Sequence, residues 1–407
     1  MSETMDTTYK LTKIQEIIET YDRDTSEFIV KTLPKENSDY EKYIVKYKKD
    51  CLNSENIQEN GLYRSVVVFK NINTNEYEVK SFSPPKSSNY NKFIESNEFN
   101  NCKITEIVDG TMMNLFYDDT MSEWVVCTKS NFRSNCKFNL DVDLTFKQMF
   151  EEAFESDGLT YDYFNKQYCY SFVLQHPSNR IVTPVSEPTL YLTTIYECEG
   201  TEVRYIDELH AYNRVKKPEN FKIEEFIALF CNEYDDEWLQ LTYVCSEKIL
   251  RYDIAGYNIY NKDGIRTKIR NLSYEYVKRM KGNGQKRLFT YLQLRKSGNL
   301  NEFMEYYPEY VEEFDVYKDQ LYDWTDKLYN TYVDCFILKN KTLKNADFEL
   351  KPILYDIQKE YLTNLMPNGR KVTFKYIVQY VKDMAVQKVM FSMNYKHRKN
   401  VPVAQAV

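Results

Sequence analysis

Residues 104–119 read ITEIVDGTMMNLFYDD: an apolar stretch, an Asp-Gly-Thr turn and a second apolar stretch. Short runs of apolar and β-branched residues that are bounded by such turns are typical of β-strands. Gly110 tolerates the backbone angles of a tight turn, and the side chain of Asp109 can cap it. The stretch therefore predicts two consecutive strands that are joined at Asp109 and Gly110.

Strand patterns continue on both sides of this turn, and helical periods interrupt them. The sequence predicts hairpins at residues 60–82 and 189–206, strands at 122–130 and 168–174, and helices at 146–155 and 223–230. Because strands and helices do not alternate regularly, the pattern indicates an α+β domain rather than a parallel α/β sheet.

The C-terminal third of the chain has a helical period. Phe314, Leu321, Trp324 and Leu328 follow steps of three and four residues, as do apolar residues between positions 374 and 385. The expected organisation is a helical or extended lead-in (1–58), the α+β domain (59–273), a helical C-terminal domain (274–395) and a disordered tail (396–407).

The composition is that of an ordinary soluble globular protein, with 28% charged and 43% hydrophobic residues in 407 positions. No apolar run approaches the roughly 18 residues of a membrane helix, and the N-terminus has no apolar signal core. We expect an intracellular protein without a membrane partner. Nine scattered cysteines and three distant histidines favour neither a disulfide framework nor a histidine-rich metal site.

The charge is unevenly distributed along the chain. The formal net charge is −7, yet residues 262–296 carry 11 Lys and Arg against two acids, and residues 361–407 carry eight against one. Such blocks suit a phosphate-bearing partner that binds at a defined site. Two solvated helix faces would produce the same pattern, so both interpretations stay open.

Four stretches resemble, in the same order, motifs of the T4-like RNA ligase 1 family of ATP-dependent RNA ligases. They are LYRSVVVF (62–69) with SFSPPKSSNYNKFIE (81–95), EIVDGTMMNLFYD (106–118) with WVVCTKSNFRS (124–134), YSFVLQHPSNRIVTPVSEPTLYLTTIYE (170–197), and AGYNIYNKDGIRTKIRNLSYEYV (255–277). The most specific match is Pro-Ser-Asn-Arg-Ile-Val at residues 177–182. The resemblance spans roughly residues 60–390.

This resemblance implies a nucleotidyltransferase domain of the RNA ligase type, with ATP-grasp-like antiparallel sheets, followed by an all-helical domain. It implies ATP or another nucleotide as the candidate ligand. It also implies phosphate contacts for five cations at matching positions: Arg64, Lys92, Lys129, Lys268 and Arg270.

Three positions depart from the family pattern. Ile107 replaces the lysine that attacks the α-phosphorus of ATP, and a hydrocarbon side chain cannot form that phosphoramide. Ser171 and Ala255 replace two glutamates, which leaves a divalent ion with few hard oxygen ligands. The resemblance therefore implies an inactive member with a cationic pocket that lacks carboxylates and a tightly held metal.

The leading hypothesis is a pseudoenzyme that binds RNA or a nucleotide in the former active-site groove. Tyr257 and Phe172 are candidates for stacking on a base, although aromatic residues on strands are equally typical of a core. The basic turn at 281–287 would extend a cationic track for RNA or serve only as an interdomain loop, and the basic residues at 396–399 would add RNA or protein contacts. One alternative is a structural or assembly protein that binds protein partners. Such a protein could belong to a large DNA virus and act in the host cytoplasm or in the virion. The other is a divergent active RNA ligase.

Overall fold

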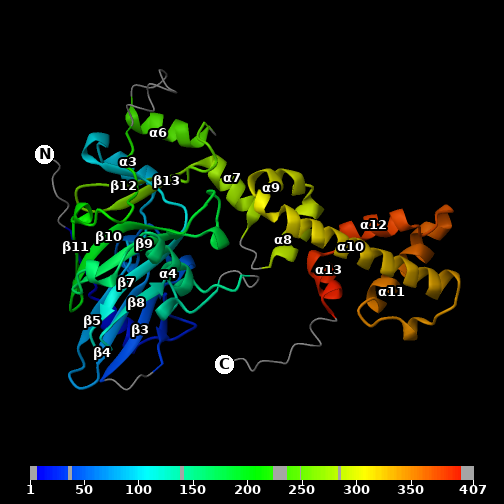
Figure 1. Cartoon of the computed structure of the whole chain (residues 1–407), viewed down its shortest axis with the longest axis horizontal. Coiled ribbons are helices and arrows are strands. Elements are labelled where there is room, and N and C mark those ends of the chain that lie inside the picture. Colours follow the sequence, from blue (N-terminus) through cyan, green and yellow to red (C-terminus); the bar gives the residue numbers. More distant parts are fainter. Residues whose placement is uncertain are drawn as a thin grey trace. The chain divides into compact units, whose positions relative to one another are not determined.

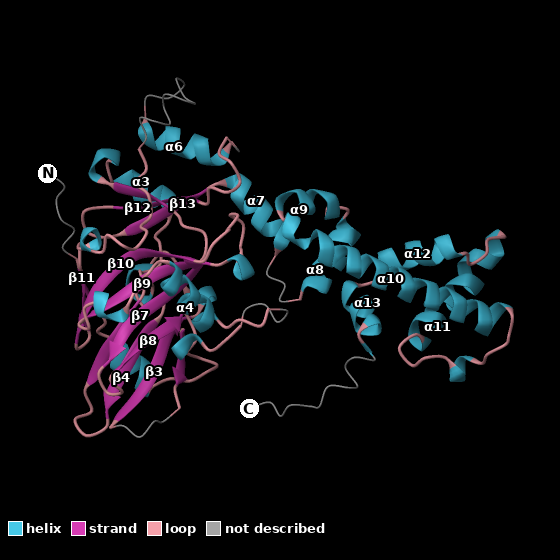
Figure 2. Cartoon of the chain, viewed as in Figure 1, coloured by secondary structure: helices cyan, strands magenta, loops and turns pink. Residues whose placement is uncertain are grey.

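The computed structural model describes residues 7–34, 39–137, 142–222, 236–247, 249–282 and 286–395. The chain divides into two compact units, unit 1 over residues 1–278 and unit 2 over residues 279–407. Unit 1 contains the β-sheets and unit 2 is helical (Figures 1 and 2). No helix within the described ranges is long and apolar enough to cross a bilayer.

The largest sheet of unit 1 has six antiparallel strands in the order β1-β11-β10-β9-β7-β8. Its strands are β1 (Thr8–Lys10), β7 (Thr111–Asp118), β8 (Glu123–Thr128), β9 (Tyr168–Gln175), β10 (Thr189–Glu199) and β11 (Glu202–Tyr205). Both faces of its central strands are buried, as the consecutive buried residues Tyr170, Ser171 and Phe172 of β9 show. Phe172 on β9, for example, is completely buried against α4 (Phe146–Ser156).

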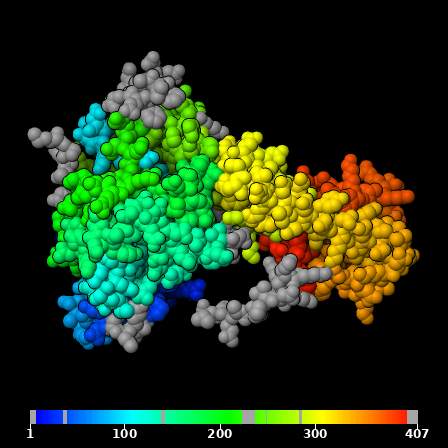
Figure 3. Space-filling view, in the orientation of Figure 1, coloured from blue at the N-terminus to red at the C-terminus, as the bar shows by residue number. Residues whose placement is uncertain are grey.

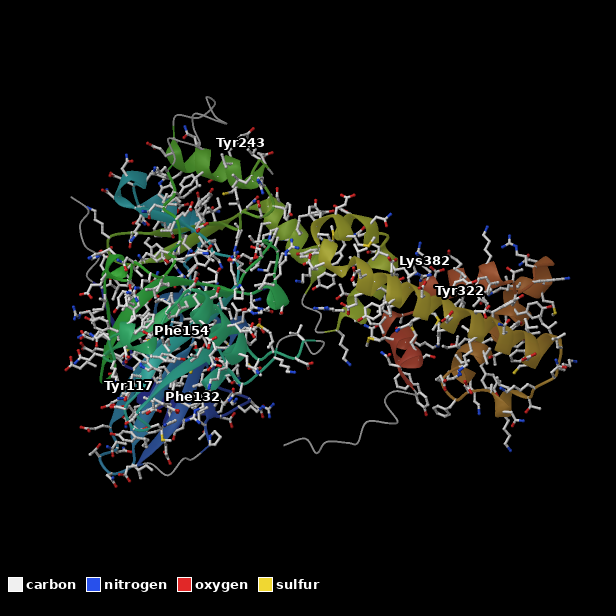
Figure 4. The ribbon with its side chains drawn as sticks, viewed as in Figure 1. Tyr117, Phe132, Phe154, Tyr243, Tyr322 and Lys382 are labelled. Atoms are coloured by element: carbon white, nitrogen blue, oxygen red, sulfur yellow. The ribbon has the colours of Figure 1, made fainter. Side chains whose placement is uncertain are left out.

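Helix α4 covers this face because its apolar residues recur at helical spacing. Thr145 caps its N-terminus in a reciprocal arrangement with Gln148, which satisfies two backbone N–H groups. Phe150 packs edge-to-face on Phe172, with 5.7 Å between the ring centroids. Figure 4 labels Phe154, which belongs to the same helix and stacks on Phe150.

A second sheet has four antiparallel strands in the order β2-β3-β4-β5. They are β2 (Phe28–Thr32), β3 (Tyr40–Tyr47), β4 (Val66–Asn71) and β5 (Tyr77–Phe82). Phe69 of this sheet packs on Phe116 of the six-stranded sheet, and Cys127 and Cys169 lie in the same buried cluster. The two sheets therefore share an apolar core.

The third sheet has the order β13-β12-β6 and consists of β6 (Lys103–Glu106), β12 (Gly256–Tyr260) and β13 (Arg266–Arg270). One face carries Ile104, Tyr257 and Ile259, which pack with Trp238 of α6 (Glu237–Ser246) and Phe93 of α3 (Tyr90–Ser96). Because side chains alternate between the faces of a strand, the polar neighbours of these residues lie on the opposite face.

Two further short helices of unit 1 are α1 (Ile14–Glu19) and α2 (Ile57–Asn60). The later helices are α7 (Leu272–Lys281), α8 (Arg287–Ser297), α9 (Leu300–Tyr306), α10 (Val311–Tyr332), α11 (Lys351–Glu360), α12 (Phe374–Asp383) and α13 (Val386–Met393). Figure 3 shows the surface that the unit 2 helices form, in yellow to red. Helix α10 buries Phe314, Leu321 and Leu328 as its period predicts, while Tyr322, labelled in Figure 4, stays 59% exposed.

The expected fold class, antiparallel sheets followed by a helical region, is confirmed. The hairpins β4–β5 and β10–β11 and helix α4 are confirmed as well. The turn at Asp109 and Gly110 differs from the expectation, because it carries the chain from β6 in the three-stranded sheet to β7 in the six-stranded sheet rather than forming a hairpin.

The N-terminal segment, expected as a helical or extended lead-in, adds β1, β2 and β3 to two sheets of unit 1. Arg64, expected on a strand, lies two residues before β4. The helix expected at 223–230 and the tail 396–407, with its basic residues, lie outside the described residues, as does the centre of the basic turn at 281–287.

Candidate functional site

A cavity of about 780 Å³ opens in unit 1 between the three-stranded and six-stranded sheets. Met112, Val173, Thr194 and Tyr205 of the six-stranded sheet line one side. The polar face of the three-stranded sheet lines the other. This cavity is our candidate functional site, because it is lined by polar and charged side chains from segments far apart in the sequence.

Strand register determines which side chains reach the cavity. Asn258 on β12 pairs with Thr105 on β6 and with Lys268 on β13, and Tyr260 pairs with Lys103 and Arg266. All six residues line the cavity. Ile107, Gly256 and Arg270 lie side by side at the end of these three strands. The N–H of Ile107 donates to the carbonyl of Gly256 at 2.8 Å, and Gly256 pairs with Arg270.

Four cations on one side of the cavity form what we call the cationic wall: Arg64, Arg266, Lys268 and Arg270. Two of the guanidinium groups are oriented by consecutive backbone carbonyls. Nη1 of Arg64 donates to the carbonyl of Pro84 at 3.3 Å, and Nη2 of Arg266 donates to the carbonyl of Pro85 at 2.6 Å. Each guanidinium has five N–H donors, so donors remain for a ligand.

The cationic wall is electrostatically unbalanced. Burial, followed by repulsion from Arg270, lowers the pKa of Lys268 to about 7. Burial, followed by repulsion from Arg266, lowers the pKa of Arg64 to about 10. Within the described ranges Arg270 has a carboxylate partner, Glu275, at 3.7 Å, whereas Lys268 has none. A bound anion would offset this repulsion and restore the charge of Lys268.

The expectation of a pocket without carboxylates is wrong, because Glu106 and Asp207 line the cavity. Burial, then the neighbouring Glu219, raises the pKa of Glu106. Its Oε1 accepts a hydrogen bond from the N–H of Glu219 at 3.1 Å. Among the described residues, no group of three or more His, Cys, Asp or Glu side chains is placed to hold a metal ion.

The structure brings together three of the five cations singled out in the sequence. Arg64, Lys268 and Arg270 line the cavity. Lys92 is exposed on α3 and does not line it. Lys129 follows β8 outside the cavity, with Nζ 4.9 Å from the ring centroid of Tyr47. Burial, then repulsion from Arg64, lowers the pKa of Lys129 to about 8.

The three positions that depart from the RNA ligase pattern have different surroundings. The side chain of Ile107 lines the cavity. Ser171 is completely buried, and its hydroxyl lies 2.9 Å from Oδ1 of Asn114, to which it donates a hydrogen bond. Ala255 is buried beside Gly256, whose φ of +116° requires glycine. Only position 107 could therefore present a side chain directly to a ligand in this cavity.

Sequence reasoning missed Arg266, although the signal was present. Arg266, Lys268 and Arg270 alternate on β13, so one strand face carries three cations. The proposed stacking residues Tyr257 and Phe172 are wrong for this cavity, because both are buried in apolar clusters. Tyr205 and Tyr260 are the aromatic residues that line it.

No family model matches the chain. A 98-residue segment is 32% identical to a protein of Rhodothermus phage RM378 described as an RNA ligase, and it covers 22% of this chain and 22% of the phage protein. The match thus spans about a fifth of that relative's length.

Solved structures of two RNA ligases are similar at lower identity. An archaeal ATP-dependent RNA ligase shares 11% identity over 94% of this chain and 78% of its own, with a TM-score of 0.38. An apo lysine-to-alanine mutant of Naegleria gruberi RNA ligase shares 14% identity over 48% of this chain and 64% of its own, with a TM-score of 0.32.

Proposed function

We propose that this protein is an RNA ligase-like pseudoenzyme that binds the phosphate of a nucleotide or of an RNA end in the cavity of unit 1. The observation that carries the proposal is the cationic wall. The four cations of this wall line a cavity that is large enough for a small ligand, and Lys268 has no carboxylate partner among the described residues. Guanidinium groups bind phosphate oxygens well because their planar donors match the anion's geometry.

The absence of covalent chemistry at position 107 is the second part of the proposal. Covalent nucleotidyl transfer needs a nucleophilic amine within about 3 to 3.5 Å of the α-phosphorus. Ile107 presents only methyl and methylene groups to the cavity. Ser171 and Ala255 carry no carboxylate, so neither position can supply one to a metal ion, and both residues are buried. Binding without covalent attachment is the behaviour that these side chains support.

The sequence match supports the ligase-like part of this proposal. The matching phage protein carries the description RNA ligase, and its segment is 32% identical to part of this chain. Arg64, Lys268 and Arg270 were assigned to phosphate contacts from family motifs alone, and all three line the same cavity. RNA or a nucleotide is therefore the ligand class that we propose.

The test measures covalent labelling and binding on the same protein. The unmodified chain and the Ile107→Lys variant are incubated with α-labelled ATP and Mg²⁺, and label is sought on a denaturing gel. We expect none on the unmodified protein. Equilibrium binding of AMP should be measurable, and Lys268→Glu combined with Arg270→Glu should remove it, because charge reversal repels the phosphate.

Each outcome of this test separates the alternatives. Label on the unmodified protein would contradict the pseudoenzyme and identify an active ligase. Absence of AMP and RNA binding would contradict the binding function and favour an assembly protein, which should be indifferent to the charge reversal and co-purify with a protein partner. Label on the Ile107→Lys variant alone would support a nucleotide pocket that has lost only its nucleophile.

A further inference from the structure

The outward side of helix α11 carries a line of large apolar side chains that face solvent. Phe348 lies in the turn that leads into α11, and Tyr355, Leu362 and Met366 follow at steps of seven, seven and four residues. Such steps place residues on one side of a helix. A π-helical turn (Tyr361–Leu365) continues α11 with helical backbone angles. The four side chains are between 48% and 64% exposed, and we call them the apolar stripe.

The opposite side of α11 is apolar as well. Ile353, Leu354 and Ile357 of this helix are buried. A surface helix normally presents polar and charged residues to solvent, whereas a helix that is apolar all round is normally covered. Contiguous exposed apolar surface is typical of a docking site. The apolar stripe is therefore a candidate docking surface of unit 2.

The last described residue of the chain, Tyr395, lies beside the first residue of this stripe. Its ring stacks on Phe348, with 5.4 Å between the ring centroids. Helix α13 leads to this contact and lies beside α11, where Lys388 pairs with Asp356 at 2.6 Å (Figure 1). Because the later residue of α13 meets the earlier residue of α11, the two helices run antiparallel. The residues that follow Tyr395 can therefore run along the stripe only after the chain reverses.

Residues 400–407, NVPVAQAV, have a composition that suits apolar surface. They carry no charged side chain, in a chain of which 28% is charged. Val401, Val403 and Val407 are separated by two and four residues, so an extended backbone places all three on one side. Pro402 favours an extended conformation for the residue before it. Segments that stay solvated are typically polar and charged, which this one is not.

The lengths of this segment and of the stripe agree. From Phe348 to Met366 a helix rises by about 27 Å, because each residue adds about 1.5 Å. Eight extended residues span about 26 Å, at about 3.3 Å for each residue. Residues 396–399 lie between Tyr395 and this segment, and a loop of two to five residues is enough for a chain to reverse. The segment can therefore follow the stripe over its whole length.

We propose that residues 400–407 bind the apolar stripe of α11 in the same molecule, as an extended segment that follows a reversal at 396–399. The sequence predicts a disordered tail here, and the stripe supplies an apolar surface on which part of that tail can become ordered. The inference is independent of the phosphate-binding function, because no residue of the unit 1 cavity takes part. A second copy of the chain is the competing occupant of the stripe.

The experiment measures how fast carboxypeptidase Y removes residues 406 and 407 from the intact protein, with mass spectrometry as the readout. Docked residues are protected, so the rate reports the fraction of molecules in which the segment is free. Tyr355→Gln/Leu362→Gln makes the stripe polar with residues that favour helix and changes no buried side chain. This variant should release both residues faster by about tenfold or more. Val401→Asp/Val403→Asp should have the same effect from the side of the segment.

The matched control is Leu239→Gln/Tyr322→Gln, which makes the same two replacements at exposed residues of α6 and α10. It should leave the release rate unchanged. If the stripe variant releases residues 406 and 407 no faster than this control, the segment does not bind the stripe and the inference is wrong. Sedimentation velocity of the same chains detects the competing occupant. A dimer of the unmodified protein that the stripe variant dissociates would assign the stripe to a second copy and would also contradict the inference.

Discussion

The hydroxyl of Tyr274 donates a 2.5 Å hydrogen bond to Oδ1 of Asp109, which lies 165 residues earlier in the chain. Oδ2 of the same carboxylate accepts the backbone N–H groups of Val182 and Thr183 at 2.8 and 2.9 Å. Asp109 therefore joins the turn beside Ile107, the segment after β9 and helix α7. In the sequence this aspartate was assigned only to capping its own turn.

Tyr274→Phe should reduce the free energy of unfolding by roughly 1.5–3 kcal/mol, because a buried carboxylate loses a charged hydrogen bond. Hydrogen exchange of the Val182 and Thr183 amides should accelerate at the same time, as their acceptor becomes less well ordered. Tyr355→Phe, which changes an exposed tyrosine on α11, is the control. Equal effects of the two substitutions would show that the Asp109 contact contributes no special stability.

Lys268 makes stability depend on pH in a defined direction. Its pKa is lowered from 10.5 to about 7 in the folded protein, so the unfolded chain binds more protons between these values. Stability contributed by this group therefore rises with pH across that window, and the cost of its charge is fully present below about pH 7. Lys268→Met should raise the unfolding free energy at pH 7, and this gain should shrink towards pH 10.

Denaturant unfolding of the unmodified protein and the Lys268→Met variant at several pH values measures this difference. Lys92→Met, which changes an exposed lysine, serves as the control. A stabilisation by Lys268→Met that is constant from pH 7 to pH 10 would show that the lysine is fully charged throughout, and would contradict its placement in an uncompensated cationic wall.

Arg266 should contribute to phosphate binding although no family motif identified it. Arg266→Ala removes a guanidinium that lines the cavity and should weaken AMP binding by roughly 1.5–3 kcal/mol, which is about 10- to 100-fold in affinity. Isothermal titration of AMP measures the change. Arg251→Ala removes an exposed arginine paired with Asp253 and should have no effect. AMP affinity that survives Arg266→Ala would place the phosphate elsewhere.

AMP binding should not require a divalent metal ion. Three guanidinium groups and Lys268 line one side of the cavity, and the described residues contain no cluster of three metal-ligating side chains. We expect the same AMP affinity in the presence of Mg²⁺ and of EDTA. AMP is preferred to ATP here because ATP itself binds Mg²⁺. A large loss of AMP affinity in EDTA would indicate a metal ion that is bound by carboxylates. Glu106 and Asp207 would then be the first residues to substitute.

The local pattern of the chain was sufficient to predict many elements of the fold. Alternation indicated the hairpins β4–β5 and β10–β11, and the helical period indicated α4 and α10, because these patterns report which face of an element is buried. The resemblance to RNA ligase motifs also identified Arg64, Lys268 and Arg270 as candidates for phosphate binding. Position 107 could be read as non-nucleophilic from its residue type alone.

Tertiary structure decided which of these residues share a site. The register of β13 and β12 adds Arg266 to the cavity, while Lys92 and Lys129 lie outside it. Glu106 lines the cavity from the end of β6, although it pairs with Tyr257 of the apolar face. The sequence by itself determined strands, helices and the hydrocarbon side chain at position 107, because these depend on residue type and short-range periodicity. Charge proximity depends on long-range strand pairing, which only the folded chain specifies.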